Sequence, residues 1–317
     1  MRFGPTVVVV ALGLSGCRDE SHIETPGIVN LGATCYYNSL WQVLAHAAPF
    51  KEYVEGLPEP AIGTREGRYI AAAKNLVALL WTNSTAPIDS SALFESFRAF
   101  SPGQYSKRAQ NDAAEAFEYL VNRLGDSAAA AGAAAPNLFN TIQQDAVACT
   151  DPVMQLREEA KLTLTVSLEL KGERGEKQLE DLLQTHFAEK RYADCLVGTQ
   201  RTQLMYAPEL LVVNIVRQQL KETASGHLAV DAKRTDAVSV PLNLDLSNVG
   251  GRVLDARYAL AGVIYHRGTD NRGHYVADFF HTVHNKWVHA NDKRTSSIER
   301  PPLHSTTAYM YFYLKQH

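Results

Sequence analysis

The spacing of apolar residues divides the chain into a helical first part and a strand-rich second part. Apolar residues recur at helical spacing in four segments, which predicts helices at 38–47, 69–82, 89–100 and 111–124. Gly125 follows the last segment and is expected to end that helix. The alanine-rich stretch 127–137 comes next, and we interpret it as a flexible connection rather than a helix extension.

After this connection the apolar pattern changes. The segment 161–170 alternates polar and apolar residues, as a half-buried strand does. The segment 209–217 is almost continuously apolar, which predicts a strand buried on both faces. A short helix is expected at 177–190, and further strands at 237–246, 256–266, 274–280, 286–290 and 308–315. The second half is therefore expected to be mainly an antiparallel sheet, which places the chain in the α+β class.

Composition and charge narrow the class of protein. The 317 residues are 45% hydrophobic and 21% charged, which is ordinary for a soluble globular protein. The net charge of -3 gives no sign of a nucleic-acid-binding surface. The 11 histidines follow no metal-ligand spacing and the 4 cysteines form no Cys-x-x-Cys pair, so we expect neither a metal nor another cofactor. Four cysteines are too few for a disulfide scaffold, but a single Cys149–Cys195 bridge remains an open alternative.

The N-terminal segment 1–17 resembles a secretion signal. Its apolar run follows a single positive charge and is too short to span a bilayer as a helix. The residues Leu-Ser-Gly-Cys that end at Cys17 resemble the lipobox of bacterial lipoproteins, and the polar stretch 18–26 resembles a tether. This resemblance implies membrane attachment through a lipidated Cys17 in a bacterial envelope, or a secreted or effector protein. The alternative is a first strand or a chance apolar run, in a cytoplasmic protein.

The segment GATCYYNS, residues 32–39, places a cysteine directly before an apolar helix. At a helix N-terminus the backbone N–H groups and the macrodipole favour the thiolate, so Cys35 is a candidate nucleophile. The alternative is a buried structural cysteine, because free cysteines are among the most buried residues. A nucleophile also needs a base, a group that orients the base, and donors for an oxyanion.

His274 is the candidate base. It stands at the start of the expected strand 274–280, and the next strand ends beside Asn291 and Asp292. A hairpin of these strands brings His274 near both side chains, either of which can accept from the imidazole and fix its tautomer. Adjacent side chains of a regular strand point to opposite faces, so both are not expected to sit equally well beside the imidazole. The chain order Cys, His, Asn is that of papain-like proteases.

Four stretches resemble the ubiquitin-specific proteases, which are papain-like deubiquitinases. They are GIVNLGATCYYNSLWQVL (27–44), similar to the family's cysteine box; QNDAAEAFEYL (110–120), similar to a helix start; ELLVVNIVR (209–217), similar to a palm strand; and the stretch from YALAGVIYH to AYMYFYL (258–314), similar to the histidine box and closing strand. The resemblance implies one catalytic domain at 27–317. Its parts would be a helical thumb at about 27–135, reduced β fingers at about 138–205 and a β palm at about 206–317.

The resemblance also assigns catalytic roles. It implies that Cys35 is the nucleophile, His274 the base and Asn291 the third member of the triad. Asn30 matches the side chain of the oxyanion hole. Asp292 matches an acidic neighbour that assists either the imidazole or the oxyanion network. The implied activity is thiol-dependent hydrolysis of the isopeptide or peptide bond after the C-terminal glycine of ubiquitin or a ubiquitin-like modifier.

Three further residues match substrate-binding positions of the family. Asp112 matches an acidic residue that meets the arginine-rich tail of ubiquitin, although a plain helix cap explains it equally well. Gly273 and Tyr275 match residues that line the narrow channel for the Gly-Gly tail, and a bare glycine leaves room for a substrate backbone. The implied partners are ubiquitin and ubiquitinated proteins.

The chain also departs from the family's pattern. Many members bind a structural zinc with two Cys-x-x-Cys pairs in the fingers, whereas this chain has only Cys149 and Cys195 there, so no zinc is expected. Two other functions stay open: a papain-like peptidase acting on cell-wall peptides, which the lipobox favours, and a catalytically idle ubiquitin-binding module. The complete set of cysteine, histidine and asparagines favours the deubiquitinase.

Overall fold

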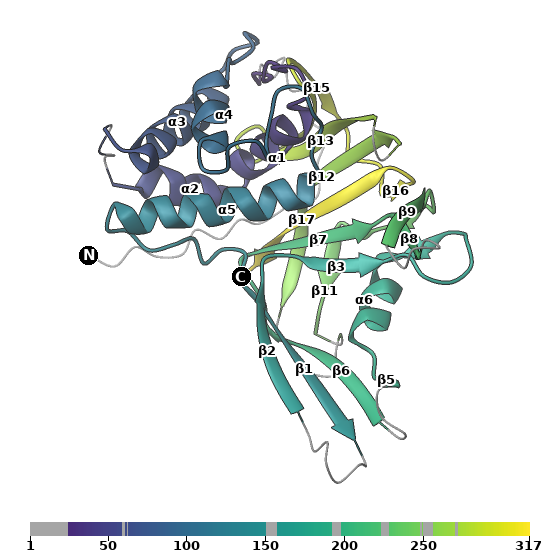
Figure 1. Ribbon diagram of the computed structural model, residues 1–317. Helices are drawn as coiled ribbons and strands as arrows, with labels where there is room; N and C mark the ends of the chain where they lie inside the picture. Colours follow the sequence, from purple (N-terminus) through teal and green to yellow (C-terminus); the bar gives the residue numbers. More distant parts are fainter. Residues whose placement is uncertain are drawn as a thin grey trace.

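The computed structural model describes residues 25–58, 61, 63–149, 157–191, 198–222, 228–247, 249, 256–269 and 272–317. The expected signal at 1–17 with Cys17, most of the tether, and Cys195 lie outside this part of the chain. Within it, the first five helices form one lobe, a large sheet forms a second lobe, and a narrow sheet extends away from both (Figure 1).

The first part of the chain is helical, as predicted. The helices are α1 (Cys35–His46), α2 (Ala48–Gly56), α3 (Arg65–Leu80), α4 (Ser91–Arg98) and α5 (Ala113–Ala130). The apolar spacing did not predict α2, because only Phe50 and Val54 of its nine residues are buried. No helix of the described residues is long and apolar enough to cross a membrane.

The prediction that Gly125 ends the fourth helix is wrong, because α5 continues through the alanine-rich stretch to Ala130. A Cβ on Gly125 would lie 3.3 Å from the Cβ of Ala135, so the glycine lets the returning chain pack closely on the helix. The helix ends at Ala130, two residues before Gly132, whose φ of 79° lies in the left-handed region. The N–H groups of Gly132 and Ala133 donate back to carbonyls of the last helical turn, which is a Schellman motif.

An eight-stranded sheet forms the second lobe and confirms the α+β class. Its strands run in the order β15-β14-β13-β12-β17-β7-β3, and β11 pairs with β12. The predicted strand 209–217 is β7, which lies between β17 and β3 and is buried as expected. The strands are β3 (Val166–Glu169), β7 (Leu210–Val216), β11 (Asn243–Asp245), β12 (Arg257–Gly268), β13 (Gly273–His281), β14 (Lys286–Asn291), β15 (Arg294–Ile298) and β17 (Ala308–Gln316).

A narrow four-stranded sheet, in the order β2-β1-β6-β5, extends from the large sheet (Figure 1). The predicted strand 161–170 is in fact two strands, because the chain leaves the narrow sheet at the end of β2 and enters the large sheet as β3. The apolar pattern did not predict β1 or β6, whose residues are mostly half-buried. The strands are β1 (Thr141–Cys149), β2 (Arg157–Thr163), β5 (Lys190–Arg191) and β6 (Gly198–Tyr206).

Smaller elements complete the described part of the chain. The predicted helix at 177–190 is α6 (Leu179–Phe187), which packs its apolar side against the large sheet. The predicted strand 237–246 contains two short strands, β10 and β11. The remaining strands are β4 (Lys177–Gln178), β8 (Gln218–Glu222), β9 (Leu228–Lys233), β10 (Val238–Ser239) and β16 (His304–Ser305).

Helix α1 lies in the middle of the molecule. All 12 of its residues are buried, and it contacts α2, α3 and α5 on one side and β12, β13 and β14 on the other. Gly262 of β12 makes this close approach feasible, because an added Cβ would lie 2.4 Å from Cγ1 of Val43. The first residue of α1, Cys35, is thereby held against the start of β13.

Candidate active site

Cys35 is the first residue of α1, and only 2% of it is exposed. Burial raises the pKa of its thiol, and the negative charge of Asp292 raises it further. Hydrogen bonds from the main-chain amides of Tyr275, Tyr36 and Cys35 itself lower this pKa without cancelling the effect of burial. The main-chain amides at the start of α1 thus favour the thiolate, but burial outweighs them, and the thiol needs a base to remove its proton.

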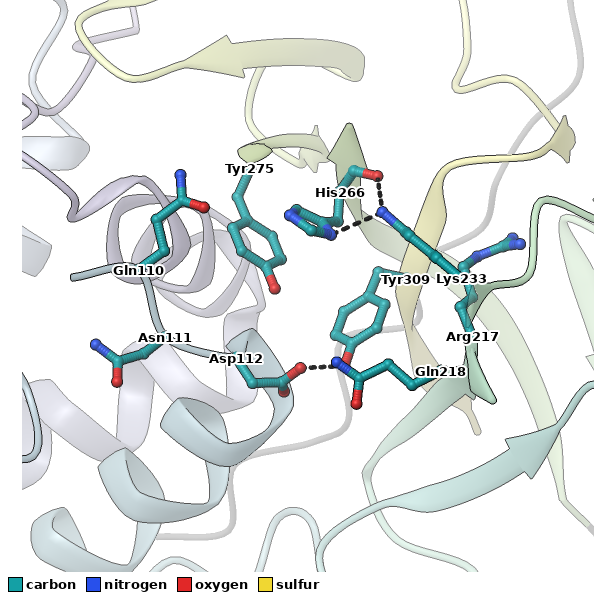
Figure 2. A pocket seen from close by; sticks show the side chains of 9 residues that line it. All are labelled: Gln110, Asn111, Asp112, Arg217, Gln218, Lys233, His266, Tyr275 and Tyr309. Atoms are coloured by element: carbon teal, nitrogen blue, oxygen red, sulfur yellow. Dashed lines mark hydrogen bonds between the residues drawn. The ribbon is translucent and has the colours of Figure 1, made fainter. Parts of the chain in front are cut away.

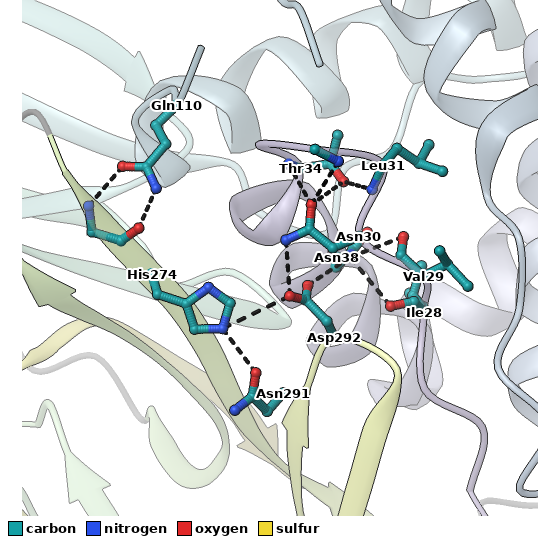
Figure 3. A network of polar contacts seen from close by, with 12 residues as sticks. Ile28, Val29, Asn30, Leu31, Thr34, Asn38, Gln110, His274, Asn291 and Asp292 are labelled. Atoms are coloured by element: carbon teal, nitrogen blue, oxygen red, sulfur yellow. Dashed lines mark hydrogen bonds and ion pairs between the residues drawn. The ribbon is translucent and has the colours of Figure 1, made fainter. Parts of the chain in front are cut away.

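His274, the second residue of β13, is the candidate for that base. Its Nε2 lies 2.8 Å from Oδ1 of Asn291 (Figure 3). An amide oxygen can only accept a hydrogen bond, so Nε2 carries the proton of the neutral imidazole. The other ring nitrogen, Nδ1, is then the basic one, and His274 directly precedes Tyr275, whose main-chain amide contacts the thiol.

Asn291 and Asp292 both face His274, which a regular strand would not allow. Strand β14 ends at Asn291, and Asp292 has a φ of 50°, in the left-handed region. This turn carries the second side chain to the same side as the first. The two side chains are not equivalent. Oδ2 of Asp292 lies 3.7 Å from Nε2 of His274, which is too far for a hydrogen bond, whereas Oδ1 of Asn291 lies within hydrogen-bond distance of the same atom.

The carboxylate of Asp292 is held by two asparagines (Figure 3). Its Oδ2 accepts from Nδ2 of Asn30 at 2.9 Å, and its Oδ1 accepts from Nδ2 of Asn38 at 2.8 Å. Asn38 was not among the residues predicted from the sequence. An amide in the middle of an apolar helix was the signal that could have found it, because a buried amide needs partners.

The amide of Asn30 is fixed in one orientation. Its Oδ1 accepts from the backbone N–H groups of Gly32 at 2.9 Å and Thr34 at 3.2 Å. Its Nδ2 therefore faces Asp292, and one of its two hydrogens is used in that bond. The predicted residues Cys35, His274, Asn291, Asp292 and Asn30 thus gather at the junction of α1, β13 and β14.

Asp112 is the N-cap residue of α5. Its Oδ1 accepts from the backbone N–H groups of Ala114 at 2.7 Å and Glu115 at 3.1 Å, and its Oδ2 accepts from the hydroxyl of Tyr309. The helix-cap interpretation therefore accounts for these contacts. A role toward a substrate tail stays a prediction.

A cavity of about 140 Å³ opens between the start of α5 and the large sheet (Figure 2). Asp112 and Tyr275 line it together with His266, which the sequence analysis missed. The His266 ring stacks on Tyr275, with ring centroids 4.4 Å apart, and its Nδ1 lies 2.8 Å from Nζ of Lys233. A Cβ on Gly273 would lie 2.0 Å from Nε2 of His266, so the stacked ring already uses the space that this glycine leaves.

The predicted absence of zinc concerns Cys149 and Cys195. Cys149 is disulfide-bonded, and its partner lies outside the described residues. A disulfide sulfur is not a thiolate and does not ligate zinc as one. Within the described ranges, no three His, Cys, Asp or Glu side chains are grouped in a way that could hold a metal ion.

Known proteins resemble this chain, some over most of its length and others over a part of it. Human Ubl carboxyl-terminal hydrolase 18 is 22% identical over 322 residues, which cover 91% of this chain and 84% of that protein. Ubiquitin carboxyl-terminal hydrolase 3 of Saccharomyces cerevisiae is 36% identical over 83 residues, which are 23% of this chain and 9% of that protein. The matched stretch of the yeast ubiquitin carboxyl-terminal hydrolase 8 covers 24% of that protein. The chain therefore spans only a small part of the length of these yeast relatives.

Solved structures share the fold. The SAGA DUB module Ubp8/Sgf11/Sus1/Sgf73 bound to ubiquitin aldehyde superposes with a TM-score of 0.76 at 20% sequence identity, over 94% of this chain and 71% of that chain. This likeness confirms the expected α+β, papain-like fold. The model of the family described as ubiquitin carboxyl-terminal hydrolase matches residues 26–313. This match includes every predicted catalytic and substrate-binding residue, and the chain belongs to the ubiquitin carboxyl-terminal hydrolase family.

Proposed function

We propose that the chain is a cysteine-dependent deubiquitinase that hydrolyses the bond after the C-terminal glycine of ubiquitin or a ubiquitin-like modifier. The observation that carries the proposal is the contact of 2.8 Å between Nε2 of His274 and Oδ1 of Asn291. Asn291 accepts a hydrogen bond from Nε2 of His274, so Nδ1 is the basic nitrogen of the ring. His274 lies on β13 directly before Tyr275, whose main-chain amide contacts the Cys35 thiol. A buried thiol with a raised pKa gains its reactivity from such a base.

The proposed mechanism uses each residue at a stated atom. Nδ1 of His274 takes the thiol proton of Cys35, and the sulfur attacks the carbonyl of the C-terminal glycine. The second Nδ2 hydrogen of Asn30 and the backbone N–H of Cys35 stabilise the oxyanion, as preorganised donors do in acyl transfer. The imidazolium then protonates the leaving amine, and water releases the acyl-enzyme.

Ubiquitin is the proposed partner, either free or joined to proteins. The family match supports this proposal, as does the likeness of fold to a module whose structure contains ubiquitin aldehyde. We further propose that the thumb spans about 27–135, the fingers about 138–205 and the palm about 206–317.

The test is turnover of a fluorogenic ubiquitin C-terminal amide. We expect activity in the wild type, none in Cys35→Ala, and a loss of roughly 10²-fold in kcat with little change in KM for Asn30→Ala. Wild-type protein that binds ubiquitin without turnover would instead be an idle binding module. Protein that ignores ubiquitin but cleaves cell-wall peptides would be the other papain-like peptidase.

We also propose that Cys17 is lipidated and anchors the chain to a membrane, on the lipobox-like sequence before it. Expression in a bacterium, with mass spectrometry of the N-terminus, tests this. The expected product begins at a diacylated Cys17, and Cys17→Ser abolishes the modification. A product that keeps residues 1–16 contradicts the proposal.

A further inference from the structure

The start of β13 has an edge that no described strand covers. One edge of β13 pairs with β12 from Phe279 down to Gly273, which lies opposite Gly268. Within the described residues, the other edge pairs with β14 only from Ala277 onward. Backbone groups of alternate residues point to the same edge of a strand, so Gly273 and Tyr275 present their N–H groups on this free edge.

The N–H groups of Gly273 and Tyr275 on this free edge have different partners. The amide of Tyr275 contacts the Cys35 thiol. At Gly273, Oε1 of Gln110 accepts from the backbone N–H at 2.8 Å, and Nε2 of Gln110 donates to the backbone carbonyl (Figure 3). A primary amide in this orientation offers one acceptor and one donor, as one residue of a neighbouring strand does. Gln110 therefore completes the strand edge next to the nucleophile.

The loop that carries Gln110 is anchored at its next two residues. Nδ2 of Asn111 donates to the hydroxyl of Tyr36 at 3.3 Å, and Asp112 accepts from Tyr309. The Gln110 side chain itself is exposed and makes its contacts at its tip. Its amide can therefore leave Gly273 by side-chain rotation while the loop stays in place.

We propose that Gln110 is a gating residue that stands in for the substrate backbone. An extended C-terminal tail whose last carbonyl reaches Cys35 would run along the free edge of β13 and use the N–H and carbonyl of Gly273, as an added strand does. Gln110 occupies both groups in the free protein and is displaced when the tail enters. This inference rests on the proposed function, because it assumes that the thiol attacks an extended tail.

Gln110→Met tests the gate, because methionine has nearly the same length and cannot make either hydrogen bond. We expect the KM for the fluorogenic ubiquitin substrate to fall by roughly threefold to tenfold, because two competing hydrogen bonds of modest net strength are lost. The kcat should not change. Gln104→Met is the matched control: this exposed glutamine of the same loop bonds to Ser101 and Tyr105 and should leave both constants unchanged.

Two thiol reagents test the gate without ubiquitin. A Gly-Gly peptide chloromethyl ketone must bind along the free edge of β13 before it reacts with Cys35, whereas the small reagent iodoacetamide does not use this edge. Gln110→Met should accelerate the peptide reagent several-fold and leave iodoacetamide unchanged. Slower reaction with the peptide reagent, or a raised KM, would mean that Gln110 holds the substrate rather than blocks it. Equal acceleration of both reagents, or no reaction of the peptide reagent with any variant, also overturns the gate.

The outcomes separate the gate from the proposed function. If the wild type does not turn over the ubiquitin substrate but the two reagents behave as expected, the proposed function is wrong and the proposal of a gate stands. If the wild type turns over the ubiquitin substrate and Gln110→Met has the same KM and the same rates with both reagents, the proposed function stands and the gate is wrong.

Discussion

A thiol that is buried before substrate arrives depends on its neighbours for ionisation. Burial and the carboxylate of Asp292 raise the pKa of Cys35, while three main-chain amides lower it. The same carboxylate holds the amides of Asn30 and Asn38. Asp292 thus has two opposite effects: its charge disfavours the thiolate, and its Oδ2 orients the amide of Asn30, the proposed oxyanion donor.

Alkylation of Cys35 by iodoacetamide in a His274→Ala background isolates the thiol from the imidazole. Because burial raises the thiol pKa above the ordinary value of 9.0, we expect the rate to keep rising with pH beyond 9. Adding Asp292→Asn removes the negative charge, so the profile should move to lower pH. A midpoint below 9 in His274→Ala, or a shift to higher pH in the double variant, contradicts this account.

Turnover separates the roles of Asn291 and Asp292. Asn291→Ala should lower kcat roughly tenfold or more, because the tautomer of His274 is no longer fixed, and Asn291→Asp should keep much of the activity. Asp292→Asn leaves one oxygen for two asparagine amides, so kcat should fall with little change in KM. Steady-state kinetics on the three variants checks this. Nearly wild-type Asn291→Ala together with inactive Asp292→Asn would assign the orienting role to Asp292.

At the scale of elements, the long periodic segments were predictable and the contacts between them were not. Most helices of the first lobe and β7 follow from apolar spacing, and the cysteine and histidine motifs lie at the starts of α1 and β13, which contact each other. Asn38 and Gln110 escaped because their partners are distant in the chain. The alternation rule could not anticipate the left-handed residue that ends β14, which puts Asn291 and Asp292 on one side.

The contact between α1 and β12 limits how the nucleophile is held. Gly262→Ala would put a Cβ 2.4 Å from Cγ1 of Val43, so it should destabilise the protein by about 1–3 kcal/mol and lower turnover by shifting α1. Adding Val43→Ala removes the clashing methyl groups, so the double variant should lose less stability than the sum of the single variants. Urea unfolding measures all three.

Gly56→Ala is the control for this series, because a Cβ at the end of α2 meets no atom within 4 Å. It should leave stability and turnover close to wild type. Additive losses in the double variant would mean that Gly262 and Val43 do not constrain each other.

On the scale of the whole molecule, the two lobes meet where α1 packs on β13. Two buried histidines lie at the end of this contact that is far from Cys35. His46 closes α1 and stacks on Phe279 of β13, with ring centroids 3.9 Å apart, and His281 lies next to it. Burial lowers the pKa of His46 to about 3 and that of His281 to about 4. Both are therefore neutral in the folded protein at neutral pH.

These histidines should make the junction sensitive to acid. Unfolded histidine binds a proton near pH 6.5, whereas the folded pair binds only near 3 to 4, so protons favour the unfolded state between these values. The contribution to stability is complete above about pH 6.5 and is lost as pH falls. His281→Phe removes one such group and should move the acid-unfolding midpoint, followed by circular dichroism, to lower pH. The exposed His317→Ala should not move it, and equal midpoints for both variants contradict the prediction.

The complete burial of α1 has a consequence for hydrogen exchange. A helix with no exposed face has no solvent-side turn that can fray alone, so its amide protons should exchange only when the molecule opens as a unit. The free energy of exchange in α1 should then equal that of global unfolding, while amides in the edge strands of the narrow sheet should have a smaller free energy of exchange. The nucleophile would thus sit in the slowest-exchanging part of the protein, while the loop in front of it carries Gln110 at its surface.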